Sequence, residues 1–278
     1  MARFGRGRWA VVPRRPVAAA LVAVAVAATG RTLEVLTGLH EVVGAPVASP
    51  VLALLAGALA SRRAGKERSE YSFDGSTAVR VLAVGGLGVL AVQVVAHGLA
   101  VGAVFAAGGD AGLVIQGESP STKSTATAQV VAYLAFGVLL TAVGEEVLFR
   151  GALLGSLTER VGFWRANAVQ AGLFGAWHLA WPLAVALGPF EPPVAMPVYA
   201  LGFVLVPAVV GGVLGVLVRA TGTLWTGVVA HAVHNGVALF VHVDGGASVL
   251  SPALVLGYVT LGWWAWSRWP GQFPGEGG

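Results

Sequence analysis

The chain has 278 residues, of which 56% are hydrophobic and only 11% charged, and its formal net charge is +4. This composition excludes an ordinary soluble domain and indicates a protein that crosses a membrane several times. The sequence contains no cysteine, which excludes disulfides, thiolate catalysis and cysteine metal ligands.

A transmembrane helix needs about 20 mainly apolar residues. Eight stretches of the chain fit this length and composition, and the first is the weakest because Arg31 and Glu34 interrupt it. We therefore expect an all-α, polytopic membrane bundle of about eight transmembrane helices. The predicted spans are 16–36, 43–60, 80–106, 127–150, 166–187, 197–218, 223–242 and 248–266.

The basic residues predict the orientation of these spans. With eight spans, every lysine and arginine except Arg31 and Lys123 falls on one side of the membrane. Cytoplasmic loops carry the excess of lysine and arginine in membrane proteins. We therefore expect a multi-pass protein of the cell membrane with both termini in the cytoplasm.

Two adjacent carboxylates, Glu145 and Glu146, lie inside the span predicted at 127–150. A charged side chain in an apolar span is costly, and it indicates a functional site with a partner. Glu146 and Arg150 are four residues apart with the acid first, so we expect them to form an ion pair at the membrane boundary. Glu145 points about 100° away from Glu146 and needs another partner or a proton.

Two later spans also carry polar side chains. Phe174 and His178 share one face of the span at 166–187, and His231 and Asn235 share one face of the span at 223–242. Taken singly, a histidine or asparagine in such a helix is more typical of a hydrogen bond between helices than of catalysis.

Together the polar residues of these three spans indicate a hydrolytic site. With the predicted orientation, Glu145, His178 and His231 lie at similar depths in a cavity that opens toward the cytoplasm. A carboxylate can deprotonate water and an imidazole can exchange protons, while a second imidazole and the Asn235 amide can donate to an oxyanion. The same glutamate and two histidines could instead ligate zinc, so a metal site and a metal-free site both stay open.

The order and spacing of these residues resemble the three motifs of the CAAX protease and bacteriocin-processing (CPBP, or Abi) family of intramembrane proteases. The matching segments are Glu145-Glu146-x-x-x-Arg150, Phe174-x-x-x-His178 and His231-x-x-x-Asn235. The resemblance implies a membrane-embedded endopeptidase that hydrolyses a peptide bond of a membrane-associated protein or peptide. In a metal-independent mechanism, it further implies that Glu145 and His178 activate the water.

The same resemblance assigns His231 and Asn235 to the oxyanion. Supporting roles fall to Glu146, Arg150 and Phe174. It also divides the chain into N-terminal membrane helices without a recognised motif at 1–127, a catalytic membrane region at 128–240, and a last transmembrane helix with a flexible tail at 241–278. The partners implied are membrane lipids and a protein or peptide substrate near the cytoplasmic membrane face, with no nucleic acid.

Two other classes of function stay open at this point. One is a non-catalytic binding or bacteriocin-immunity protein that holds a peptide or lipid in the cavity. The other is a proton-coupled transporter whose carboxylates relay protons. The sequence does not select a substrate, nor whether that substrate is prenylated.

Overall fold

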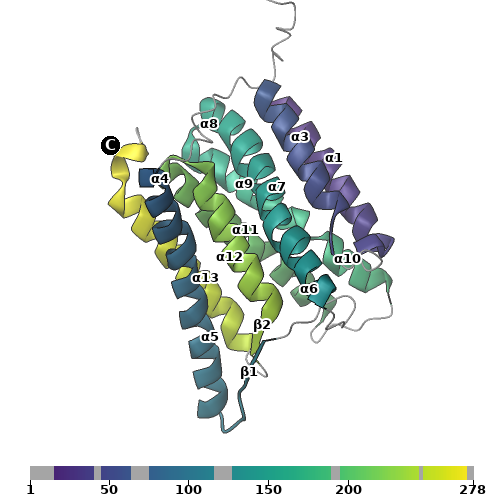
Figure 1. Cartoon of the computed structure of the whole chain (residues 1–278), viewed down its shortest axis with the longest axis vertical. Helices are drawn as coiled ribbons and strands as arrows, with labels where there is room; N and C mark the ends of the chain where they lie inside the picture. The colour runs from purple at the N-terminus through teal and green to yellow at the C-terminus, as the bar shows by residue number, and fades with distance from the viewer. Residues whose placement is uncertain are drawn as a thin grey trace, which may run out of the picture.

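The computed structural model describes residues 16–40, 45–63, 75–115, 127–188, 195–243 and 247–273 of the chain. It is an all-α membrane bundle, as the sequence predicts (Figure 1). Several predicted features lie outside the described residues. These are Lys123, the tail after residue 273, and the basic N-terminus with Arg3, Arg6, Arg8, Arg14 and Arg15.

Three groups of helices build the bundle. The first is the pair α1 (Pro16–Leu36) and α3 (Ala48–Arg63). The second is a long helix from Thr127 to Val161, which contains α6 (Thr127–Ala132), α7 (Thr141–Glu146) and α8 (Gly155–Val161) with π-helical turns between them. The third group comprises α9 (Phe163–Trp177), α11 (Met196–Thr221), α12 (Leu224–Phe240) and α13 (Ala247–Arg268), with the long helix of α4 (Gly75–Arg80) and α5 (Gly88–Ala106) beside α12 and α13.

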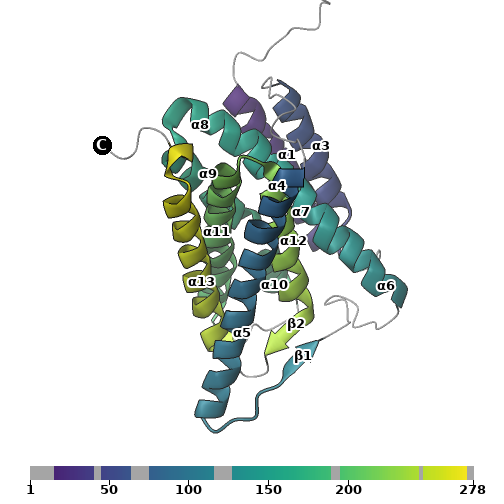
Figure 2. The ribbon, with the colours of Figure 1, turned by 60° about the vertical axis from the view of Figure 1, so that its left-hand side comes forward.

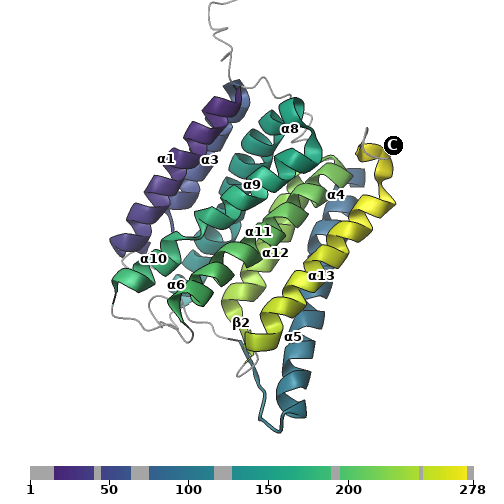
Figure 3. The same ribbon diagram turned by 180° about the vertical axis from the view of Figure 1, so that it is seen from behind.

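The bundle has two distinct ends (Figures 1 and 3). At one end lie the turn from α8 to α9, the start of α4 and the end of α13, and we call it the arginine-rich end. The described arginines at its helix termini are Arg62, Arg80, Arg160, Arg165, Arg219 and Arg268. At the other end β1 (Leu113–Ile115) pairs antiparallel with β2 (Val241–Val243), and we call it the β-ladder end (Figure 2).

Not every predicted span is long enough to cross a membrane by itself. Within the described ranges, five helices are long and apolar enough: Pro16–Leu36, Gly75–Ala106, Val130–Val161, Met196–Thr221 and Val249–Arg268. Helix α3 is apolar but shorter, and α9 and α12 have 15 and 17 residues. The number of eight transmembrane helices therefore stays a prediction.

The prediction of a single helix at 166–187 is wrong, because the helix is interrupted after Trp177. Helix α9 ends there and a separate short helix, α10 (Ala180–Leu187), follows. Pro182 has no N–H to donate to the carbonyl of His178, which lies four residues earlier. That carbonyl instead accepts a bond from the N–H of Trp181 at 3.3 Å. The break leaves His178 at the junction of the two helices.

The predicted end of the fourth span at residue 150 is also wrong. The helix continues to Val161 and stops at Gly162, whose φ of 77° few other residues adopt. Glu145 therefore lies near the middle of this helix rather than close to a membrane boundary. Arg150 and the residues around it remain helical because the bundle surrounds them, and Leu148, Phe149 and Leu153 are fully buried.

Close helix contacts depend on glycine at particular positions. A Cβ on Gly144 would lie 2.5 Å from the carbonyl oxygen of Pro50, so α7 and α3 can approach only because residue 144 has no side chain. By contrast, a Cβ on Gly98 would meet no atom within 4 Å. The approach of α3 to α7 brings the α1–α3 pair against the helix that carries both glutamates.

We predict that Gly144→Ala destabilises the protein by roughly 1–3 kcal/mol, because the new methyl group must displace the backbone of α3. The thermal transition of the purified protein in detergent measures this. The matched control is Gly98→Ala, which should leave the transition unchanged or raise it, since alanine favours a helix over glycine. Equal transitions for the two variants would contradict the close contact.

Candidate active site

The two adjacent glutamates are both buried, with relative exposures of 1% for Glu145 and 0% for Glu146. Their helix packs against α3 and α12 and, through η4 (Val147–Leu154), against α9. Because the residues are neighbours on a helix, their side chains leave it in different directions. Each carboxylate therefore has its own set of partners.

Glu146 forms the expected ion pair with Arg150. The Oε1–Nη1 distance is 2.7 Å, and both side chains are fully buried. Arg150 Nη2 also donates to the carbonyl oxygen of Gly211 at 2.9 Å, and its guanidinium lies 4.5 Å from the centroid of the Phe174 ring. The pair lies in the interior of the bundle and joins α7, α9 and α11. Its expected position at a membrane boundary stays a prediction.

Glu145 pairs with a different arginine, Arg31 of α1. Arg31 Nη1 lies 3.1 Å from Glu145 Oε1, and the Nε1–H of Trp177 donates to the same oxygen at 2.8 Å. Sequence reasoning placed Arg31 inside the first predicted span, on its non-cytoplasmic side, and assigned it no partner. The signal that could have found it was present: a lone arginine in an apolar span indicates an acidic partner in another span.

His231 lies between the two carboxylates. Its Nδ1 is 2.9 Å from Glu146 Oε1, and its Nε2 is 3.7 Å from Glu145 Oε2. An ionised carboxylate accepts hydrogen bonds and donates none, so the Nδ1 atom of His231 carries a proton. The Nε2 atom then has a free lone pair in the neutral ring and donates toward Glu145 in the imidazolium form.

His178 is oriented by its own helix. Its Nδ1 is 2.8 Å from the carbonyl oxygen of Phe174, which can only accept, so Nδ1 is protonated and Nε2 can accept a proton. The Phe174 ring packs edge-on against the rings of both His178 and His231, with centroids 5.0 and 5.7 Å apart. Phe174 therefore sets the position of both imidazoles.

One cavity of about 480 Å³ contacts all four residues predicted to be catalytic, namely Glu145, His178, His231 and Asn235. Further polar residues along its wall are Arg31, Glu34, His40, Ser49, Tyr133, Thr141 and His234. The Glu34 carboxylate accepts bonds from the backbone N–H groups of Val47, Ala48 and Ser49 at 2.8 Å each. Glu34 thereby fixes the start of α3 at the cavity wall.

The prediction that this cavity lies at the arginine-rich end is wrong. Its lining comes from the end of α1 and the start of α3, from the first part of the helix that begins at Thr127, from α10, from the first half of α11 and from the end of α12. All of these segments lie toward the β-ladder end (Figures 1 and 3). The error arose because the sequence placed Glu145 near the end of its helix, whereas the helix continues for sixteen residues beyond it.

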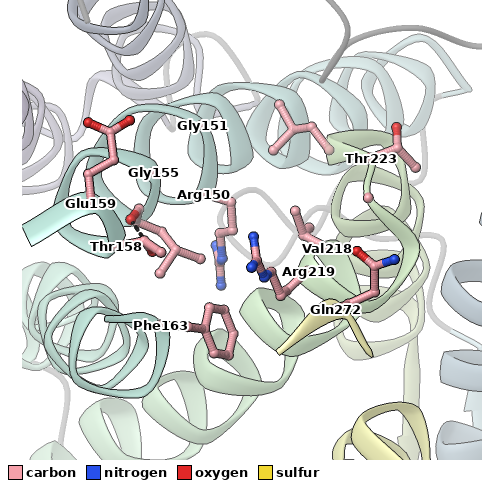
Figure 4. Close-up of a pocket in the computed structure, with 13 residues that line it drawn as sticks. Arg150, Gly151, Gly155, Thr158, Glu159, Phe163, Val218, Arg219, Thr223 and Gln272 are labelled. Atoms are coloured by element: carbon pink, nitrogen blue, oxygen red, sulfur yellow. Dashed lines mark hydrogen bonds between the residues drawn. The ribbon is translucent and has the colours of Figure 1, made fainter. Parts of the chain in front are cut away.

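A second cavity of about 400 Å³ lies at the arginine-rich end (Figure 4). Arg150 and Arg219 project into it, and Thr158, Glu159 and Phe163 also line it. None of the four residues predicted to be catalytic contacts this cavity. The two cavities thus lie on opposite sides of the Glu146–Arg150 pair.

A second polar cluster, which the sequence did not reveal, is joined to the site through His234 of the cavity wall. His234 Nδ1 lies 2.8 Å from the Tyr258 hydroxyl and 2.9 Å from Gln93 Nε2. Gln93 and Tyr258 are 1% and 0% exposed. These contacts join α12, which carries the third motif, to α5 and α13, neither of which carries a recognised motif.

The residues suggested as zinc ligands do not fit a metal site as they are arranged. Among the described residues, no group of three or more histidine, aspartate and glutamate side chains converges as metal ligands do. Glu145 Oε1 already accepts hydrogen bonds from Arg31 and Trp177. The positive charge of Arg31 next to this carboxylate would repel a metal cation.

Comparison with known protein families gives a match to part of the chain. Residues 127–237 match the sequence model described as type II CAAX prenyl endopeptidase Rce1-like. The comparison with curated proteins finds no match. The matched segment contains all three motifs, so the match confirms the resemblance that they suggested.

We predict that Arg31→Met destabilises the protein by about 3–5 kcal/mol, because it leaves the Glu145 charge buried without its cation. Arg31→Met/Glu145→Gln should recover much of that loss, since no charge is then stranded. Thermal or chemical denaturation of the purified variants measures both. Arg62→Met, at the exposed end of α3, is the control and should change stability by no more than about 0.5 kcal/mol. If the stability loss of the double variant equals the sum of the losses of the two single variants, an ion pair between Arg31 and Glu145 is contradicted.

Proposed function

Since residues 127–237 match the sequence model of Rce1-like type II CAAX prenyl endopeptidases, we propose that this multi-pass membrane protein cleaves peptide bonds with water activated by Glu145. One observation carries the proposal. Glu145 lies at the wall of the same cavity as His178, His231 and Asn235, and its Oε1 atom is held by Arg31 and Trp177. The carboxylate is thus fixed at one oxygen and available at the other.

In the proposed mechanism, Glu145 Oε2 removes a proton from water as the water oxygen attacks the carbonyl carbon of the peptide bond. His178 accepts a hydrogen bond from the same water at Nε2, because its Nδ1–H is already donated to the Phe174 carbonyl. Two acceptors aimed at one water orient it and raise its nucleophilicity.

The tetrahedral oxyanion needs hydrogen-bond donors. The Asn235 amide supplies two N–H groups from the cavity wall. His231 can donate only from Nε2, and only as imidazolium, because Nδ1–H faces Glu146. We therefore propose that His231 takes the proton from Glu145 across the 3.7 Å between Nε2 and Oε2 and then delivers it to the leaving amine.

Glu146, Arg150 and Phe174 act as positioning residues in this mechanism. Glu146 holds His231 by Nδ1, and Arg150 holds Glu146. Gly227 of α12 makes room for this arrangement, because a Cβ there would collide with Glu146 Oε2. None of the three contacts the water or the peptide carbonyl in the proposed geometry.

The two other functions predict different behaviour. A binding or immunity protein would hold a peptide without hydrolysing it, and a transporter would couple Glu145 to proton movement without cleavage. The family match favours the peptidase over both. Mass spectrometry of a quenched-fluorescent peptide library, with prenylated CAAX peptides as one arm, tests for hydrolysis by the purified protein. Absence of any cleavage in every arm would contradict the proposal.

We predict that Asn235→Ala lowers kcat by about 10²–10³ with a smaller change in KM, because an oxyanion donor acts mainly in the transition state. Steady-state kinetics on a peptide found in the library measures the split. Asn235→Asp keeps the side-chain shape but removes the N–H donors, and it should lose at least as much kcat. A variant that changes KM alone would place Asn235 in substrate binding instead.

A further inference from the structure

The cavity at the candidate active site extends toward one end of the bundle. From Glu145 the cavity extends toward the β-ladder end, past Tyr133 and Trp181 to Ala238, whose side chain is exposed. The Asp110 side chain, between α5 and β1, is exposed at the same end. A substrate that reaches Glu145 through this cavity therefore enters from the β-ladder end.

Close packing separates Glu145 from the other end. Beyond Glu146 toward the arginine-rich end, Leu148, Phe149 and Leu153 have no exposed surface, and neither do Leu214 and Leu217 of α11. These side chains belong to one continuous core. The cavity in Figure 4 is lined by Arg150, Gly151 and Leu154, and Glu145 is not among its lining residues.

The distribution of charge orients the two ends relative to the membrane. Of the arginines whose side chains the structure describes, only Arg31 and Arg150 are buried, and both are in ion pairs. The other six lie at the arginine-rich end, where α1 also begins (Figures 1 and 3). The excess of arginine and lysine stays on the cytoplasmic side of a membrane protein.

We propose that the site takes its substrate from the extracytoplasmic side of the membrane. This inference rests on the proposed peptidase function, and it names the substrate class: a membrane-anchored protein or peptide whose cleaved segment lies outside the cytoplasm. Tyr133, Phe203 and Leu239 give the cavity wall an apolar surface, which fits a segment with apolar side chains. A prenylated chain end in the cytoplasm would face the arginine-rich end, where the packed core closes the path to Glu145.

The absence of cysteine from the chain makes a direct test possible. Single cysteines are introduced as Ala238→Cys in the cavity wall, Asp110→Cys at the β-ladder end and Glu159→Cys at the arginine-rich end. All three replaced side chains are exposed, and none belongs to the proposed catalytic machinery. Each variant is treated with a charged, membrane-impermeant maleimide in right-side-out and in inverted vesicles, with the cysteine-free protein as the blank.

The proposal predicts labelling of Ala238→Cys and Asp110→Cys in right-side-out vesicles, and labelling of Glu159→Cys only in inverted vesicles. Labelling of Ala238→Cys together with Glu159→Cys would overturn it, as would reversed labelling of all three. No labelling of Ala238→Cys from either side would also overturn it, because the cavity would then be closed to water. Labelling does not depend on turnover, so an inactive protein with the predicted pattern would contradict only the peptidase function.

Discussion

The structure depends on the burial of two neighbouring carboxylates inside an apolar bundle. Removing an ion from water costs several kcal/mol even after relaxation, and the cost is offset only where partners are well placed. Here Arg31 compensates Glu145 and Arg150 compensates Glu146, at 3.1 and 2.7 Å. With His231 neutral between them, the cluster carries no net charge.

These partners come from distant parts of the chain, so the ion pairs also determine which helices meet. Arg31 brings α1 to the glutamates, Trp177 brings α9, and the Gly211 carbonyl brings α11. In lipid there is little hydrophobic drive for one helix to pack on another, and polar contacts and close packing take its place. The helices before residue 127 carry no recognised motif, yet Arg31 makes them part of the site.

The sequence predicted part of this arrangement. The acid-first spacing of Glu146 and Arg150 predicted their pair, because helical geometry alone brings residues i and i+4 together. The motif spacings identified the four residues that share the cavity, whereas their chemical roles remain a proposal. Arg31 was missed because its partner lies 114 residues away, and no local pattern encodes such a contact. The cavity was predicted at the wrong end of the bundle. The apolar stretch of the sequence ends near Arg150 whereas the helix continues to Val161, so Glu145 was predicted too close to the end of its helix.

The central claim is that the Glu145 carboxylate activates water for peptide hydrolysis. The most direct measurement compares turnover of one peptide by purified wild-type protein and Glu145→Gln in the same detergent, with folding checked by size-exclusion chromatography. Glutamine can still accept the Trp177 hydrogen bond but cannot take a proton from water. Loss of a general base typically costs about 10²–10⁴ in rate, so the account predicts a loss of at least about 10². Equal turnover by the two proteins would contradict it.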